Sequence, residues 1–206
     1  MQRNNDKIRE LTTLALLTAL VIILQTLSAF GFLKVGLFNI TLTLVPIVVG
    51  GILLGPRAGT VLGFVFGLMV CIFSVTGVDA GGLMVFQANP FLGWTMCLLK
   101  GVAAGFIPAV VYKVLPKKVP VLDAFIAAIL APVANTGIFL LGMVLFYRPL
   151  LELWKSGSAQ ASDSMLLYVI LGLCGINFII EFVTNAVLSP AIATIVKTVQ
   201  KDKRLH

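Results

Sequence analysis

The sequence predicts an all-α integral membrane protein, a single domain over residues 1–206 in which six transmembrane helices form one bundle with both termini in the cytoplasm. Of its 206 residues, 59% are hydrophobic and 11% are charged, whereas soluble domains are roughly 25% charged. Uncharged apolar runs of about 20 residues recur along the chain, the length that crosses about 30 Å of hydrocarbon. These observations exclude a soluble enzyme and a nucleic-acid-binding domain, despite a formal net charge of +7.

Six apolar segments are candidate spans, at residues 11–30, 38–54, 58–77, 91–112, 121–147 and 165–196. The first follows a basic stub without a convincing signal-peptidase site, so we expect it to be retained. The second is the weakest, because Asn39, Thr41 and Thr43 make its first turns polar. Pro46 also interrupts its hydrogen bonding. The last is too long for one vertical span, so we expect it to tilt or to run into the interface.

The distribution of Lys and Arg sets the predicted orientation. An inner N-terminus places eleven of these residues on the cytoplasmic side and three outside, namely Lys34, Arg148 and Lys155. The connections 31–37, 78–90 and 148–164 then face outward, and the short turns around 55–57 and 116–118 face inward. The basic balance therefore indicates cytoplasmic loops beside anionic lipid, with no role in nucleic-acid binding.

The sequence contains no pattern typical of a metal centre, a cofactor site or an enzyme. Cys71, Cys97 and Cys174 lie inside apolar runs without a C-x-x-C spacing, and the histidine is His206. We expect the cysteines to be small buried apolar residues. There is no nucleotide-binding loop and no catalytic grouping of Ser, His and Asp. If transport is driven by ATP, another chain must hydrolyse it.

Small residues recur at four-residue spacing on three of the predicted helices. Such ridges allow helices to approach closely in lipid. For the glycines we expect packing inside the bundle, whereas the alanines can serve either packing or docking. The ridges consist of Ala15 and Ala19, of Gly59, Gly63 and Gly67, and of Gly101 and Gly105.

Two ionisable residues lie inside predicted spans, where a charge is costly unless it faces protein or water. Lys100 lies roughly 15 Å into the fourth span at 1.5 Å per residue, and Glu181 lies near the middle of the sixth. Their opposite charges at comparable depth allow two interpretations. Either they neutralise one another as an ion pair, or Lys100 binds an anionic ligand.

Polar side chains in spans four to six predict a ligand pocket that opens outward. Asn177, Glu181 and Asn185 share one face of the sixth helix by their spacing. Asn135 lies mid-span beside Pro132, and spans one to three contribute almost no polar groups. Trp94 is as readily an interfacial residue as a ligand contact. The candidate substrate-binding residues are Asn89, Trp94, Lys100, Asn135, Asn177 and Glu181.

Several short motifs together resemble the substrate-binding subunit, or S component, of energy-coupling factor (ECF) vitamin transporters. They are the A-x-x-x-A pattern at 15–19, the stretch ITLTLVPIVVG at 40–50 and the stretch LGPRAG at 54–59. The six spans, the chain length and the basic N-terminal stub are also similar to this family. Each motif is short, so it is their combination in one chain that is specific for this family.

The resemblance implies a multi-pass protein of the bacterial plasma membrane that captures a water-soluble vitamin from outside. It implies docking through the first three helices, with Ala15 and Ala19 on the docking face. The expected partners are a transmembrane coupling subunit and two ATPase subunits. Toppling of the whole subunit in the membrane would then deliver the vitamin.

The identity of the vitamin depends on fewer residues. Lys100 favours an anionic ligand, and the second and third spans are similar to those of pantothenate-binding members. Riboflavin is the alternative, because amides, Lys100 and one tryptophan also suit its ring and ribityl chain. Few aromatic residues lie near the expected pocket, which disfavours a thiamine site. Folate, lipoate, a queuosine precursor and cobalamin stay open.

Two other function classes are alternatives. An autonomous proton-coupled carrier would use Glu181 and Lys100 and would stop when the proton gradient collapses. The sequence shows no internal repeat strong enough to support the two-half transporter pattern. A purely structural subunit would bind no ligand, and substitution of Lys100 or Asn135 would then change only stability or assembly.

Overall fold

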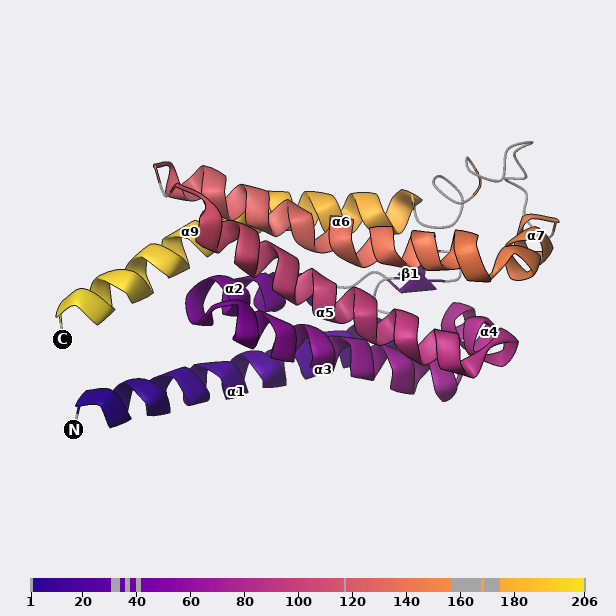
Figure 1. The fold of residues 1–206 in the computed structure, drawn as a ribbon, viewed down its shortest axis with the longest axis horizontal. Helices are drawn as coiled ribbons and strands as arrows, with labels where there is room; N and C mark the ends of the chain where they lie inside the picture. The colour runs from indigo at the N-terminus through magenta and orange to yellow at the C-terminus, as the bar shows by residue number, and fades with distance from the viewer. Residues whose placement is uncertain are drawn as a thin grey trace.

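A computed structural model describes residues 2–30, 34–35, 38–39, 42–116, 118–156, 168 and 175–205. Its long helices run side by side along the long axis of the molecule (Figure 1). The described helices are α1 (Gln2–Ala29), α2 (Leu44–Leu54), α3 (Pro56–Val75), α4 (Ala80–Ala88), α5 (Pro90–Val114), α6 (Pro120–Phe146), α7 (Arg148–Ser156) and α9 (Gly175–Leu205). A small antiparallel hairpin joins β1 (Lys34–Val35) to β2 (Phe38–Asn39).

Five of the described helices contain a segment that is long and apolar enough to cross a membrane. These segments are Lys7–Ala29, Pro56–Val75, Pro90–Val114, Pro120–Phe146 and Asn177–Val199. The predicted helical spans at 11–30, 58–77, 91–112 and 121–147 therefore correspond to α1, α3, α5 and α6. The ends shift by one or two residues, except that α1 begins nine residues before the predicted start. Helix α6 continues through Pro132 without a break.

The second predicted span, 38–54, is only partly helical. Helix α2 has 11 residues, which is roughly 16 Å at 1.5 Å per residue and about half of a hydrocarbon core. Phe38 and Asn39 belong instead to the hairpin. Pro46 is the third residue of α2, where its missing N–H would have no partner inside the helix anyway. Residues 31–33, 36–37 and 40–41 lie outside the described part of the chain.

Two outer connections that were expected to be loops contain helices. The connection 78–90 holds α4, and the connection 148–164 begins with α7. Leu151 and Trp154 are buried on the inner face of α7, and the Trp154 indole Nε1 donates a hydrogen bond to the Met84 sulfur at 3.2 Å. This contact joins α7 to α4 at the same end of the bundle.

The last predicted span, 165–196, is described from residue 175 onward. Helix α9 runs from Gly175 to Leu205 and therefore extends past the predicted end, as expected for a helix too long for one vertical span. The rest of that span, apart from residue 168, and the 157–164 part of the preceding connection lie outside the described residues. Cys174 lies there too.

The glycine ridges of α3 and α5 pack against each other, as predicted. A Cβ atom added to Gly63 would lie 2.9 Å from the carbonyl carbon of Gly101 and closer still to its oxygen. Gly59 faces the carbonyl oxygen of Gly105 in the same way. Such close backbone approach is available only to glycine, because any side chain would collide with rigid main chain.

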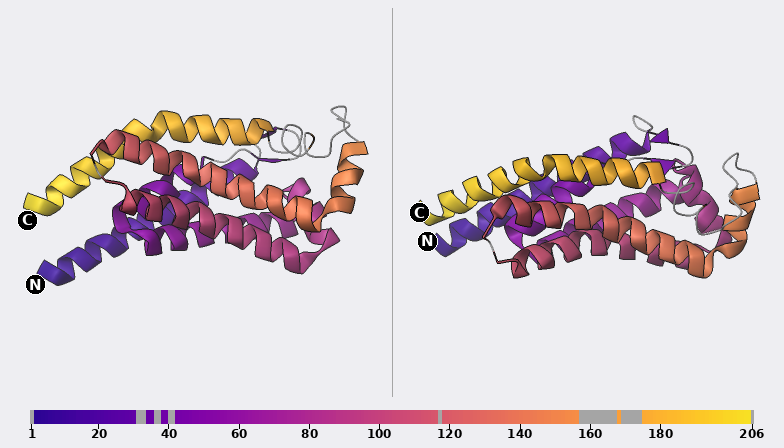
Figure 2. Two further views of the ribbon diagram at one scale, coloured as in Figure 1. Left: turned by 45° about the horizontal axis from the view of Figure 1, so that its top comes forward. Right: turned by 90° about the horizontal axis from the view of Figure 1, so that it is seen from above.

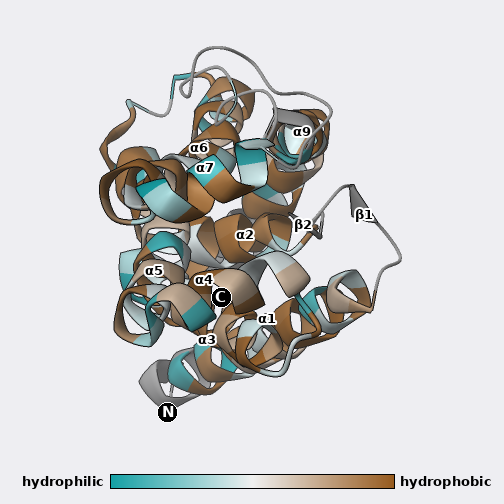
Figure 3. Ribbon diagram, turned by 90° about the vertical axis from the view of Figure 1, so that its right-hand side faces the viewer, coloured by the Kyte–Doolittle hydropathy of each residue, from teal (hydrophilic) through white to brown (hydrophobic). Residues whose placement is uncertain are grey.

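Helix α2 lies in the middle of the bundle. It packs against α1, α3, α5, α6 and α9, and an end-on view shows it surrounded by longer helices (Figure 3). Most of its side chains are buried, among them Leu44, Ile47 and Val48. Thr43, just before α2, donates a hydrogen bond from Oγ1 to Oε1 of Gln25 on α1 at 3.2 Å. The N-terminal end of α2 is therefore level with Gln25.

The described N- and C-terminal helices end on the same side of the molecule, as two further views also show (Figure 2). Helices α4 and α7 lie at the opposite end. Helix α1 contacts α2 and α3 and leaves much of its surface uncovered. Ala15 and Ala19 are exposed, and Leu16 beside them is 68% exposed.

Candidate substrate-binding site

A cavity lies inside the ring of long helices. Helix α2 contributes no lining residue, and Gln25, which marks the level of its N-terminal end, is part of the wall. The cavity has about 80 Å³ open to the centres of water molecules, where one water needs roughly 10–15 Å³. Its wall comprises Gln25, Ala29, Phe66, Val70, Phe73, Ser74, Asp79, Gly82, Val85, Phe86, Met96, Cys97, Lys100, Asn135, Thr136, Phe139, Asn177 and Glu181.

Four of the six predicted substrate-binding residues line this one cavity. Lys100 comes from α5, Asn135 from α6, and Asn177 and Glu181 from α9. The prediction that α5, α6 and α9 turn polar groups toward a shared interior is therefore confirmed. It came from helical spacing alone, because residues separated by one or two turns lie on one face.

Lys100 is the only cation among the described residues of the cavity wall. Its ammonium nitrogen lies 5.0 Å from the centroid of the Phe139 ring on α6, within the range of a cation–π interaction. The ring holds the ammonium group at the wall without using its hydrogen-bond donors. A ligand anion in the cavity can therefore accept from them.

Asn135 is 7% exposed, and its side-chain oxygen is buried without a hydrogen-bond partner among the described residues. The adjacent Thr136 also lines the cavity. Nearly all buried polar groups in proteins are hydrogen-bonded, so an orphan acceptor on a cavity wall indicates a place for a donor of a ligand or a water.

The polar stripe of α9 is buried as predicted. Glu181 and Asn185 are each 1% exposed, and Asn185 donates from Nδ2 to the backbone carbonyl of Glu181 at 2.8 Å. Asn177 lies one turn before Glu181, and its side-chain oxygen is buried without a hydrogen-bond partner in the described structure. Asn177 and Glu181 face the cavity, whereas Asn185 is not part of its wall.

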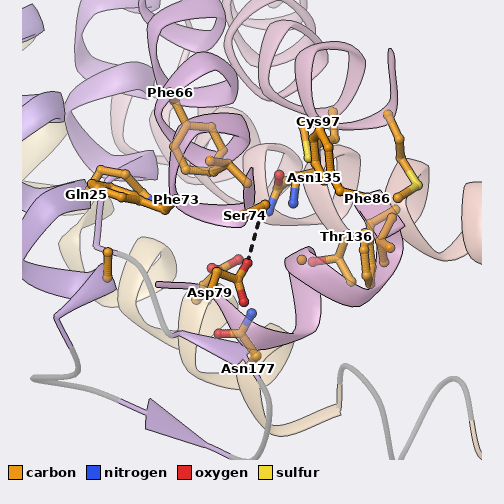
Figure 4. Close-up of a pocket in the computed structure, with 18 residues that line it drawn as sticks. Gln25, Phe66, Phe73, Ser74, Asp79, Phe86, Cys97, Asn135, Thr136 and Asn177 are labelled. Carbon is orange, nitrogen blue, oxygen red and sulfur yellow. Dashed lines mark hydrogen bonds between the residues drawn. The ribbon is translucent and has the colours of Figure 1, made fainter. Parts of the chain in front are cut away.

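The first three spans contribute more polar groups than predicted. Gln25 of α1 and Ser74 of α3 line the cavity, as does Asp79, which follows α3 (Figure 4). The Ser74 hydroxyl donates to Asp79 Oδ2 at 3.4 Å. The sequence signal for Gln25 was a lone amide near the end of an apolar run. Asp79 belongs to the connection 78–90, which the sequence predicts as an outer loop able to cover the cavity, but the sequence did not single out its carboxylate as a wall residue.

Asn89 and Trp94 lie outside the cavity wall. Asn89 caps α5, because its side-chain oxygen accepts a hydrogen bond from the backbone N–H of Leu92 at 3.1 Å, and its own carbonyl accepts one from the Tyr147 hydroxyl at 3.0 Å. Trp94 is 39% exposed. It meets Phe86 edge to face, with 5.9 Å between ring centroids, and so lies behind a residue of the wall.

The wall is otherwise apolar, as is usual for a small-molecule site. The prediction of few aromatic residues near the pocket is wrong, because four phenylalanines line it, namely Phe66, Phe73, Phe86 and Phe139. Cys97 also lines the cavity and Cys71 is fully buried, in keeping with their predicted apolar role. The described residues contain no group of three or more metal-ligating side chains.

Comparison with known proteins identifies the family. The profile of the family "ECF transporter, substrate-specific component" matches residues 9–193. The chain belongs to this family. The S component is thus a multi-pass bacterial membrane protein and the substrate-binding part of a vitamin transporter, rather than a catalytic enzyme. It is also 24% identical over 197 residues to the pantothenic acid transporter PanT of Lactococcus lactis subsp. cremoris (strain MG1363). The aligned region covers 91% of this chain and 93% of the relative.

Proposed function

We propose that this S component binds pantothenate from outside the cell. The observation that carries the proposal is Lys100, the single cation of the described cavity wall, in a cavity whose other polar groups are amides, hydroxyls and carboxyls. Pantothenate has one carboxylate, one amide and two hydroxyl groups. Its carboxylate matches Lys100, and its amide and hydroxyls match the buried oxygens of Asn135 and Asn177. The similarity to a pantothenic acid transporter supports the same ligand.

The proposed orientation places both termini in the cytoplasm, in one six-span domain. The basic residues near the two chain ends support it, as does the position of both ends on one side of the molecule (Figure 2). Helices α4 and α7 would then lie at the outer face, close to the cavity residues Gly82, Val85 and Phe86.

The proposed partners are a transmembrane coupling subunit and two ATPases, which would drive delivery by toppling of the S component. Support comes from the uncovered face of α1. Ala15 and Ala19 are exposed there, and the surrounding Leu11, Leu16 and Ile23 are each more than half exposed. Small residues flanked by large apolar ones are typical of helix-packing surfaces in membranes.

The test is titration of the detergent-purified protein with pantothenate by calorimetry. The variant Lys100→Met should weaken pantothenate binding by about 1.5–3 kcal/mol, or roughly 10- to 150-fold, which is the scale of a hydrogen bond to a charged group. It should leave binding of pantothenol, the alcohol analogue without a carboxylate, nearly unchanged. Lys113→Met is the matched control, because Lys113 is on the same helix but exposed at its end.

If Lys100→Met weakened the binding of pantothenate and of pantothenol equally, the assignment of Lys100 to the ligand carboxylate would be wrong. Failure of the folded wild-type protein to bind pantothenate, together with binding of riboflavin, would replace the proposed substrate by the second vitamin. Uptake by the chain alone that stops with the proton gradient would instead favour the proton-coupled carrier.

A further inference from the structure

Asp79 lies at the start of a helix, but its side chain does not cap that helix. It is the N-cap residue of α4, and aspartate is among the residues preferred there because its carboxylate accepts from the first free N–H groups of the helix. In this structure the Asp79 side chain makes no such cap hydrogen bond. Its carboxylate lines the cavity instead.

The backbone of Asp79 is held from both sides. Its N–H donates to the Phe73 carbonyl at 3.0 Å, and its carbonyl accepts from the Leu83 N–H at 2.9 Å. These two bonds hold the Asp79 backbone between the end of α3 and the first turn of α4, and the Ser74 hydroxyl holds its carboxylate. A group fixed before the ligand arrives loses little conformational freedom on binding.

One carboxylate oxygen is occupied and the other is not. Oδ2 accepts from the fully buried Ser74 hydroxyl at 3.4 Å, whereas Oδ1 is buried without a hydrogen-bond partner among the described residues. Figure 4 shows the carboxylate between Ser74 and Asn177. A buried carboxylate oxygen without a donor is unfavourable unless a ligand or water supplies one.

Gly82 lets the Ser74–Asp79 pair pack directly against the backbone of α4. A Cβ atom at position 82 would lie 2.6 Å from Asp79 Oδ2 and 2.7 Å from the Cβ of Ser74. Any side chain there would displace the Ser74–Asp79 pair, so the first turn of α4 is shaped around it. The missing cap bond and the orphan oxygen therefore indicate that the Asp79 carboxylate is available to a ligand in the cavity, and Gly82 allows the Ser74–Asp79 pair to pack against α4.

We propose that Asp79 is a specificity-determining residue that accepts a hydrogen bond from a hydroxyl group of the bound ligand, with Ser74 as its positioning residue. This inference rests on the proposed pantothenate function. The ligand carboxylate takes Lys100 as its partner, and we assign to Asp79 the hydroxyl groups, which are the donors of pantothenate farthest from its carboxylate. The carboxylate thereby selects a hydroxylated acid over an apolar acid of the same length.

The test compares pantothenate with N-(3,3-dimethylbutanoyl)-β-alanine, which has the same carboxylate and amide but neither hydroxyl. The wild-type protein should bind pantothenate at least about 10-fold more tightly, and Asp79→Asn and Asp79→Ala should each weaken pantothenate by about 10- to 100-fold. Both variants should bind the hydroxyl-free analogue as the wild type does. The ratio of the two affinities should therefore fall toward one.

Glu152→Gln is the matched control, because Glu152 is an exposed acid on α7 and its loss changes the net charge equally. Ser74→Ala keeps the carboxylate and should lower the ratio in the same direction by a smaller factor, which also tests the proposal if the Asp79 variants fold poorly. Equal weakening of both ligands by these variants, or no weakening of either, would refute the role of Asp79 while leaving pantothenate binding intact. A folded wild-type protein that binds neither compound would refute the proposed function and this assignment together.

Discussion

Replacement of Gly63 by alanine tests the packing of α3 against α5. The added Cβ atom would lie 2.9 Å from the Gly101 carbonyl carbon and 3.2 Å from the Val102 Cα. Ordinary carbon–carbon contact begins at about 3.5 Å, which alone requires α5 to move away by roughly 0.6 Å, and the still closer contact with the Gly101 oxygen raises this displacement to about 1 Å. Both obstacles are main-chain atoms of a helix, which cannot rotate aside as a side chain can.

The expected cost follows from that displacement. A gap of this size forfeits about a quarter to a half of a well depth of roughly 0.1–0.2 kcal/mol at each atom pair, and the interface contains on the order of several tens of pairs. The loss is therefore about 1–3 kcal/mol, the same range as is found for overpacked interiors.

Gly137→Ala on α6 is the matched control, because no described atom lies within 4 Å of a Cβ built at that position. Both variants gain the same helix propensity, about 1 kcal/mol for alanine over glycine, so their difference isolates the packing cost. The free energy of unfolding, measured by SDS titration in mixed micelles, should be lower in Gly63→Ala than in Gly137→Ala by about 1–3 kcal/mol. Equal stability of the two variants within about 0.5 kcal/mol would show that α3 and α5 are not in backbone contact at this level.

Two further predictions concern the outer surface of α1 and the start of α5. Ala15→Trp or Ala19→Trp should prevent co-purification with the coupling subunit and leave pantothenate affinity unchanged, because both alanines are exposed and neither lines the cavity. Normal assembly would contradict the docking assignment. Asn89→Ala should lower the unfolding free energy by about 1 kcal/mol, because the N–H of Leu92 loses its cap. Ligand affinity should not change, and a selective loss of affinity would place Asn89 in the binding site.

The helical spacing of polar residues predicted most of the cavity. Lys100, Asn135, Asn177 and Glu181 converge because each sits in a long continuous helix, where position along the sequence determines both depth and face. The glycine ridges were predictable for the same reason. Gly59 and Gly63, four residues apart, both lie in the continuous helix α3 and are buried on one face of it.

The parts that sequence reasoning missed lie where continuous helical spacing ends. Asp79 follows a turn at Gly77, whose φ of 80° is readily adopted only by glycine, and the direction of the chain after such a turn is not encoded in periodicity. The length of α2 was overestimated, because an apolar run that extends back to residue 38 does not show where pairing into a hairpin replaces the helix. Asn89 resembled a pocket residue because helix caps and ligand-binding amides use the same side chain.

The short central helix α2 also gives the molecule an insulating layer. None of its 11 residues has a side chain that can form a hydrogen bond, and Figure 3 shows it apolar along its length. Moving a bare carboxylate through such a layer would cost on the order of 20 kcal/mol in the idealised Born limit. Helix α2 therefore offers a charged ligand no polar partner in the middle of the bundle, and we expect no path for an anion along this helix.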